Sequence, residues 1–352
     1  QRRALRKFVR SPFFNKRLDV IALFDYMYQI PLTNRESLRK EVVFHNLFPN
    51  EKYSADKVDY TMSFLNKLVE KFLVHQNAMR NKLDQQIALL EEYRQLGLKK
   101  HYHQVLSAAE RHLKQSNHRN IDYHEYAFVL EREHYQFLAR EQREEKKNLQ
   151  ALSDKWDTLY IARKLKESCL MLAHQAVLKQ KYTFGALDAI LSYVESSTAL
   201  LDVPSIGLYY YYYLAAMLNQ AGEEYYRKVK VLFEIEEAAA LDREELKDLY
   251  TIAVNYCIRR SNMGDGAVYQ QELFDWYLFG LESSLLLDDG QLSPFRFNNL
   301  IKLALRLEKL QWAEDFIKEA RDLLDPYHRS MYVHTAYCML FFAKGHYEET
   351  LK

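Results

Sequence analysis

Glycine and proline are scarce in this chain, which holds nine glycines and six prolines among 352 residues. A sheet protein of this length needs many turn residues, so their scarcity argues against a β fold. It predicts long helices joined by short connections. The length also exceeds what one ordinary core supports, unless that core extends in one dimension.

Cysteine and long apolar runs are scarce as well. Cys169, Cys257 and Cys338 lie more than 80 residues apart and show no pairing pattern, so we expect free thiols in a reducing compartment and a cytoplasmic protein. No apolar run reaches the roughly 18 residues of a membrane-spanning helix, so we predict no membrane span. The chain begins at Gln1 without a Met and ends inside an expected helix, and we therefore expect it to be part of a longer protein.

Motifs that carry chemistry are also missing from the sequence. It contains no glycine-rich phosphate loop, no Gly-x-Ser-x-Gly and no Cys-x-x-Cys. His124-Glu125 begins a His-Glu-x-x-His pattern, but Phe128 occupies the last position. We predict no catalytic residues, no cofactor and no metal site, and we expect the chain not to be an enzyme. An enzyme whose catalytic domain lies beyond Lys352 is a rival that these residues leave open.

What the sequence does contain is a repeated helix-turn pattern near its end. Trp312 and Tyr347 are 35 residues apart, and each follows an apolar segment that stops at a lysine three residues earlier. A period near 34 residues, in which an apolar helix, a short turn and an aromatic residue follow one another, is typical of stacked helical hairpins. The 27 tyrosines and 19 phenylalanines suit such a fold, because large rings fill the gaps between crossing helices.

These patterns predict an all-α fold, an α-solenoid of stacked antiparallel helical hairpins behind an N-terminal helical cap. The basic cap covers residues 1–80 and the repeats cover 81–352, with a further boundary near 182–205. Within the cap, we expect Ser11 to begin one helix and Ser54 to begin another, whose apolar stripe includes Met62.

Further helix limits follow from capping residues in the repeat region. Asp242 and the Ser293-Pro294 pair each precede an apolar periodic segment and are expected to open helices. A helix over residues 122–152 and a partner over 156–181 form the longest expected hairpin.

The last hairpins resemble the tetratricopeptide repeat family. The final unit carries Tyr337, Phe341, Gly345, Tyr347 and Thr350 at the signature positions of that family, and the preceding unit offers Trp312, Ala320 and Pro326. The resemblance implies right-handed superhelical stacking and a concave groove for peptides or partner helices. The Ser-Pro-Phe-Phe-Asn-Lys segment, residues 11–16, resembles uncharacterised bacterial repeat proteins of Bacteroidetes type, which brings no known activity.

Five consecutive tyrosines are the most unusual local feature. On a helix, Tyr209, Tyr210, Tyr211, Tyr212 and Tyr213 place rings all round the axis. The ordinary interpretation is packing. The functional interpretation is an aromatic wall for a peptide, completed by Tyr225 and Tyr226 on the next helix.

Charge is uneven along the chain although the net charge is only +1. Residues 1–80 carry 15 Lys or Arg against 8 Asp or Glu, and residues 221–290 carry 7 against 15. We predict a non-enzymatic scaffold whose groove binds a protein or peptide partner, aided by the acidic 221–290 surface.

The alternative is a regulator linked to nucleic acid, with a helix-turn-helix-like N-terminal region and the repeats as a sensor arm. Its candidate residues are the basic side chains of the first helix: Arg2, Arg3, Arg6, Lys7 and Arg10. Helix-turn-helix motifs turn in about three or four residues, whereas residues 48–53 form a longer connection. Nucleic acid is therefore not the expected partner.

Overall fold

The computed structural model describes residues 1–31, 34–140, 147–178, 180–217, 222–234, 241–262 and 266–347. These residues form helices and no strands, and the one β-bridge among them, between Asp288 and Gln291, closes a turn. The all-α prediction is confirmed. Thr350, one of the residues that carried the family resemblance, lies outside the described residues.

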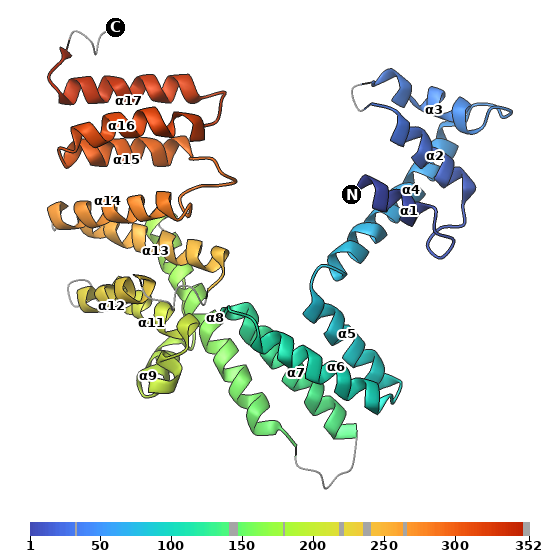
Figure 1. The fold of residues 1–352 in the computed structure, drawn as a ribbon, viewed down its shortest axis with the longest axis horizontal. Coiled ribbons are helices and arrows are strands. Elements are labelled where there is room, and N and C mark those ends of the chain that lie inside the picture. The colour runs from blue at the N-terminus through green and yellow to red at the C-terminus, as the bar shows by residue number, and fades with distance from the viewer. Residues whose placement is uncertain are drawn as a thin grey trace. The chain divides into compact units, whose positions relative to one another are not determined.

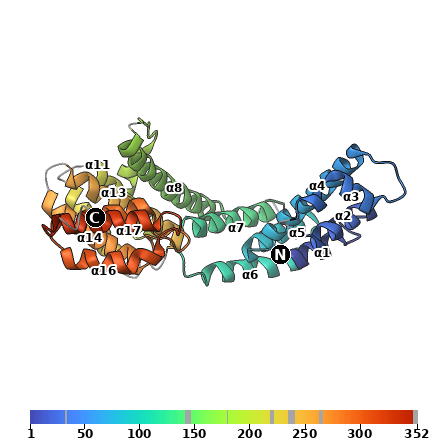
Figure 2. The same ribbon diagram turned by 90° about the horizontal axis from the view of Figure 1, so that it is seen from above.

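The helices form two compact units, residues 1–109 and 110–352 (Figures 1 and 2). The sequence analysis placed this boundary after residue 80. The core of the second unit begins at Ile121, so the two helices between residue 80 and Ile121 contribute no residue to it. That core then continues to Leu340 without a break at 182–205, where a further boundary was expected.

The first unit is built around α2, which contacts α1, α3 and α4. Its core contains Phe8, Leu23, Phe44 and Leu65, and Phe8 stacks on Phe14 with 4.0 Å between ring centroids. The helices of this unit are α1 (Arg2–Val9), α2 (Leu18–Gln29), η1 (Glu36–Leu38), α3 (Lys40–Leu47), α4 (Ala55–Ala78), α5 (Lys82–Gln95) and the first part of α6 (Lys99–Lys114).

Two local predictions for this unit are wrong and one is confirmed. Ser11 does not begin a helix; its carbonyl accepts the amides of Phe14 and Asn15 in a turn, and α2 begins only at Leu18. Met62 is 40% exposed, because the buried stripe of α4 passes through Thr61 instead. Ser54 does cap α4, since its hydroxyl accepts the amide of Lys57 at 3.3 Å.

The second unit contains the end of α6, then the long pair α7 and α8, and continues through shorter helices. α8 contacts α7, α9, α11 and α13, and from α13 onward each helix contacts the next one along the chain. In Figure 1, α14, α15, α16 and α17 lie in successive layers. The helices are α7 (Ile121–Arg140), α8 (Leu149–Leu178), α9 (Leu187–Glu195), α10 (Thr198–Leu201), α11 (Pro204–Met217), α12 (Glu223–Glu234), α13 (Arg243–Ser261), α14 (Gly266–Glu282), α15 (Pro294–Arg306), α16 (Leu310–Ala320), η4 (Arg321–Leu323) and α17 (Arg329–Ala343).

The limits expected for the long pair differ from those observed. The expected helix over 122–152 ends at Arg140, and residues 149–152 belong to the start of α8. Part of the expected span, residues 141–146, lies outside the described residues. Asp242 and Ser293 cap α13 and α15 as expected, accepting the amides of Glu245 at 2.8 Å and Arg296 at 3.3 Å.

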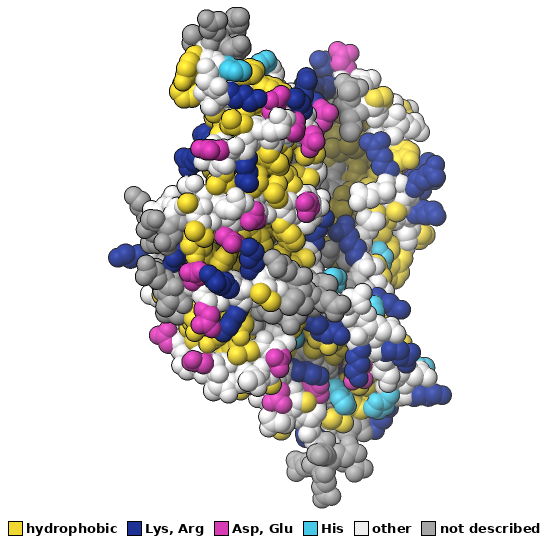
Figure 3. Space-filling view, turned by 60° about the vertical axis from the view of Figure 1, so that its left-hand side comes forward, with side chains coloured by type: hydrophobic (Ala, Val, Ile, Leu, Met, Phe, Trp, Pro, Cys, Tyr) yellow, Lys and Arg dark blue, Asp and Glu magenta, His cyan; other side chains and the backbone are white. Residues whose placement is uncertain are grey.

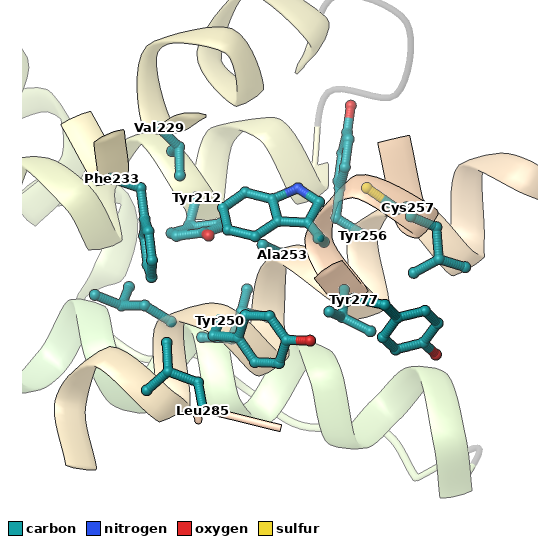
Figure 4. Packing of buried hydrophobic residues seen from close by; sticks show 14 of the residues in the cluster. Tyr212, Val229, Phe233, Tyr250, Ala253, Tyr256, Cys257, Tyr277 and Leu285 are labelled. Atoms are coloured by element: carbon teal, nitrogen blue, oxygen red, sulfur yellow. The ribbon is translucent and has the colours of Figure 1, made fainter. Parts of the chain in front are cut away.

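Aromatic side chains fill the core of the second unit (Figure 4). Tyr256 stacks on Tyr226 at 4.6 Å, and Trp276 meets Phe233 edge to face at 5.2 Å. The Trp276 Nε1 donates a hydrogen bond to the Tyr226 hydroxyl at 2.7 Å. Rings of this size join α11, α12, α13 and α14 into one packed block.

Three helices end in the same kind of turn, with one residue at positive φ. After α15 this residue is Glu308 (φ 57°), and the Lys309 amide bonds the Ala304 carbonyl at 2.9 Å. Gly97 and Gly345 make the matching turns after α5 and α17. This hydrogen-bond pattern satisfies the last carbonyls of a helix and lets the chain reverse.

Candidate functional site

A groove on the second unit runs between α13, α14, α15 and α17. It consists of two adjoining cavities of about 200 Å³ and 530 Å³, which share Lys302 and Arg306 of α15 as lining residues. The smaller cavity has mixed walls of Ile258, Ser261, Asn262, Gln270, Leu273, Tyr277, Asn299 and Leu303. The larger has mainly apolar walls of Leu305, Cys338, Met339, Phe342 and Ala343.

Two cations of this groove have no partner among the residues that the structure describes. Lys302 and Arg306 are exposed, and neither forms a hydrogen bond or ion pair with a described residue. No described Asp or Glu lines either cavity. Figure 3 brings the left-hand side of Figure 1 forward, and there hydrophobic side chains gather over the second unit with charged side chains of both signs among them. The groove therefore combines an apolar wall with positive charge.

Cys338 is the thiol that can be reached from this groove. It is partly buried and lines the larger cavity, whereas Cys169 and Cys257 are buried. Burial raises the pKa of the Cys169 thiol and raises that of Cys257 to about 12. Since the thiolate is the reactive form, a thiol reagent should modify Cys338 first.

The predicted aromatic wall lies mostly inside the protein. Tyr209, Tyr210, Tyr212 and Tyr213 are at most 5% exposed, and Tyr226 is 3% exposed. Helices α8, α12 and α13 all contact α11, so rings on several sides of this helix are covered. Packing thus accounts for five of the seven tyrosines proposed to meet a partner.

The two remaining tyrosines form a small surface cluster. The rings of Tyr211 and Tyr225 stack at 6.2 Å, and the Lys228 Nζ lies 5.5 Å and 5.4 Å from their centroids. Lys228 is also bound to Glu224 at 3.0 Å, so part of its charge is already offset. This cluster offers a partner less free charge than the groove does.

Two helix starts meet in a buried polar junction. Asn120 caps α7 by accepting the Tyr123 amide at 3.0 Å, and its Nδ2 donates to Asp242, the cap of α13. Glu245, in the first turn of α13, is 2% exposed, and its Oε1 has no hydrogen-bond partner among the described residues. Burial raises the pKa of Glu245 to about 7, an effect that the nearby Lys166 ammonium partly offsets.

A cavity of about 40 Å³ beside α11 and α13 is too small for an organic ligand. It is lined by Tyr212 and Arg259 among others, and burial lowers the pKa of that arginine. The Arg259 guanidinium donates to the Ala216 carbonyl at 2.5 Å, so the side chain ties α13 to α11.

The basic residues of the first helix divide into two groups. Arg6 and Arg10 bind Asp25 of α2 at 3.2 Å and 2.5 Å, which ties α1 to α2. Arg2, Arg3 and Lys7 are exposed and have no partner among the described residues. Of the five basic candidates, only these three are free to contact a nucleic acid. The nucleic-acid alternative stays a prediction, now supported by three residues.

The sequence analysis missed the groove, although one signal was present. The α15 segment, Pro294–Arg306, contains basic residues and no acid, with Lys302 and Arg306 four residues apart. Four residues place two side chains on one helix face. The other walls come from α13, α14 and α17, and their arrangement is a property of the fold.

Comparisons with known proteins add no relative: no protein-family model matches the chain, and searches of curated proteins and of solved structures find no match. In the residues that the structure describes, no helix combines the length and apolar character needed to cross a bilayer. Nor do three or more His, Cys, Asp or Glu side chains converge there as metal ligands.

Proposed function

We propose that the chain is a non-enzymatic scaffold that binds a segment of a partner protein in the groove of its second unit. The finer architecture belongs to the proposal: hairpins α13–α14 and α15–α16, followed by α17, stack as a solenoid of tetratricopeptide type. Contacts between successive helices, and between α15 and α17, support this arrangement. In such a stack alternate helices line one concave face.

The observation that carries the proposal is the composition of the groove. An apolar wall supplies the burial that anchors a partner, while unpaired cations supply orientation. Both are present on surface-accessible residues of α15 and α17, beside Cys338. The exposed Phe342, with 64% of its surface accessible, would lose water contact on binding.

Alkylation of Cys338 provides the test. Peptides selected from a random display library on the intact protein would be added before a maleimide reagent, and the rate of Cys338 modification would be measured by mass spectrometry. Peptides that bind in the groove should slow this rate. A Cys338→Ser variant should take up no label on the same timescale, which controls for the buried thiols.

The proposal would be refuted if no selected peptide protected Cys338. A bulky adduct on Cys338 offers the reciprocal test, because it should lower the affinity of the same peptides.

A further inference from the structure

We propose that this groove takes an acidic peptide segment, whose carboxylates bind Lys302 and Arg306 while a neighbouring apolar side chain enters the larger cavity. The proposal rests on the proposed function and adds the chemistry of the partner. Its occupant is a segment of another protein.

The charges argue for an anion. Other cations of the second unit have carboxylate partners, as where Lys230 binds Glu272 at 2.7 Å and Arg296 binds Asp288 at 2.8 Å. Lys302 and Arg306 instead stand unpaired one turn apart, where like charges destabilise a helix by a few tenths of a kcal/mol. A bound carboxylate would relieve this repulsion.

The spacing limits the segment. Lys302 and Arg306 are four residues apart on α15, which corresponds to about 6 Å along the helix axis. Alternate side chains of an extended peptide lie about 6.6 Å apart, so acids at positions i and i+2 match. Packed helices lie about 8–10 Å apart, so a path across three helix layers needs about six extended residues.

The apolar wall favours a peptide over a nucleic acid. Leu305, Met339 and Phe342 line the larger cavity, and a methionine adapts its shape to varied side chains. Proteins that hold nucleic acid by charge make about six to ten phosphate contacts, whereas this groove offers two unpaired cations. A peptide with two carboxylates beside a leucine or phenylalanine fits this groove better than a nucleic acid does.

Fluorescence anisotropy of short labelled peptides tests the inference on the intact protein. One peptide alternates glutamate with leucine, and a second has glutamine at each glutamate position. We expect the glutamate peptide to bind roughly tenfold more tightly, to weaken as salt rises and to slow alkylation of Cys338. Lys302→Glu and Arg306→Glu should each lower its affinity by about five- to tenfold.

Arg321→Glu is the matched control. Arg321 is also exposed, lies outside the groove, and its side chain has no ion pair among the described residues, so the same charge change should leave affinity unaltered. Thermal unfolding should change only slightly in the three variants, because each changed side chain is exposed and a charge pair on a helix surface contributes only a few tenths of a kcal/mol.

Several results would overturn the inference. Equal binding of the glutamine peptide, or an equal loss with Arg321→Glu, would remove the role of Lys302 and Arg306. If selected neutral peptides protected Cys338 while acidic ones did not, the proposed function would stand without the acidic partner. If no peptide of either kind protected Cys338, both proposals would fall. Self-association abolished by Lys302→Glu would assign the groove to a second copy, and displacement of the peptide by an oligonucleotide would assign it to nucleic acid.

Discussion

Glu245 should make the second unit less stable as pH rises, and replacing it by glutamine should remove this effect. Its pKa is raised from 4.5 to about 7 by burial. Between these values the folded protein holds the proton more tightly than the unfolded chain does. The stabilisation from this proton is complete below pH 4.5 and is lost as pH rises through about 7.

The magnitude follows from the two pKa values. They differ by about 2.5, and each pKa unit corresponds to about 1.36 kcal/mol, so the full effect is about 3 kcal/mol. Glu245→Gln keeps the shape of the side chain and carries no charge at any pH. The free energy of unfolding of the variant, relative to the wild type, should therefore increase by about 3 kcal/mol between pH 4 and pH 8.

The assay can report on the second unit alone. All three tryptophans, Trp156, Trp276 and Trp312, lie in residues 110–352, so urea unfolding followed by tryptophan fluorescence measures this unit. Glu244→Gln is the control, since the neighbouring Glu244 is exposed and the chemical change is identical. A difference between Glu245→Gln and wild type that stayed constant from pH 4 to pH 8 would refute the reasoning, whatever its size.

Three further predictions use the same assay. Burial lowers the pKa of His124 from 6.5 to about 4, so the folded protein loses stability as the pH falls from 6.5 to 4. His124→Asn should reduce this loss by about 2–3 kcal/mol. An equal loss of unfolding free energy in wild type and variant over this pH range would contradict the prediction. Gly280→Ala places a Cβ 2.3–2.9 Å from atoms of the Tyr250 side chain and should cost about 1–3 kcal/mol, whereas Gly266→Ala, whose nearest neighbour is 3.6 Å away, should cost nothing. Equal urea midpoints for the two alanine variants would show that the Tyr250 side chain yields freely. Glu308→Gly should stabilise by roughly 0.5–1 kcal/mol, because a residue with a Cβ is strained at φ 57°; a lower urea midpoint would count against this.

Local features were predictable from the sequence because local chemistry decides them. Ser54, Asp242 and Ser293 each cap a helix where the sequence placed a cap, since one side-chain oxygen and the following amides suffice. Ser11 has the same chemistry, but Asn15 bonds the Val9 carbonyl and the Arg17 amide and holds the segment as a turn.

Burial and the groove were not predictable in the same way. Thr61 is buried while Met62 is exposed, because neighbouring helices decide which face of α4 is covered. The five consecutive tyrosines of α11 did not indicate which side of the helix is buried, and other helices in fact cover α11 on several sides. The groove needs walls from α13, α14, α15 and α17, so periodicity in one helix shows only its α15 part.

The hydrogen bond between Asn120 and Asp242 has a consequence for synthesis of the chain. It joins the caps of α7 and α13 across 122 residues. A ribosome adding about 5–20 residues per second needs roughly 6–24 s to make that stretch, so the start of α7 must wait that long for its partner. During this interval α7 and α8 are stabilised by their contact with each other, and the apolar faces that later helices will cover are still exposed. The second unit therefore reaches its native packing late, after α13 has left the ribosome.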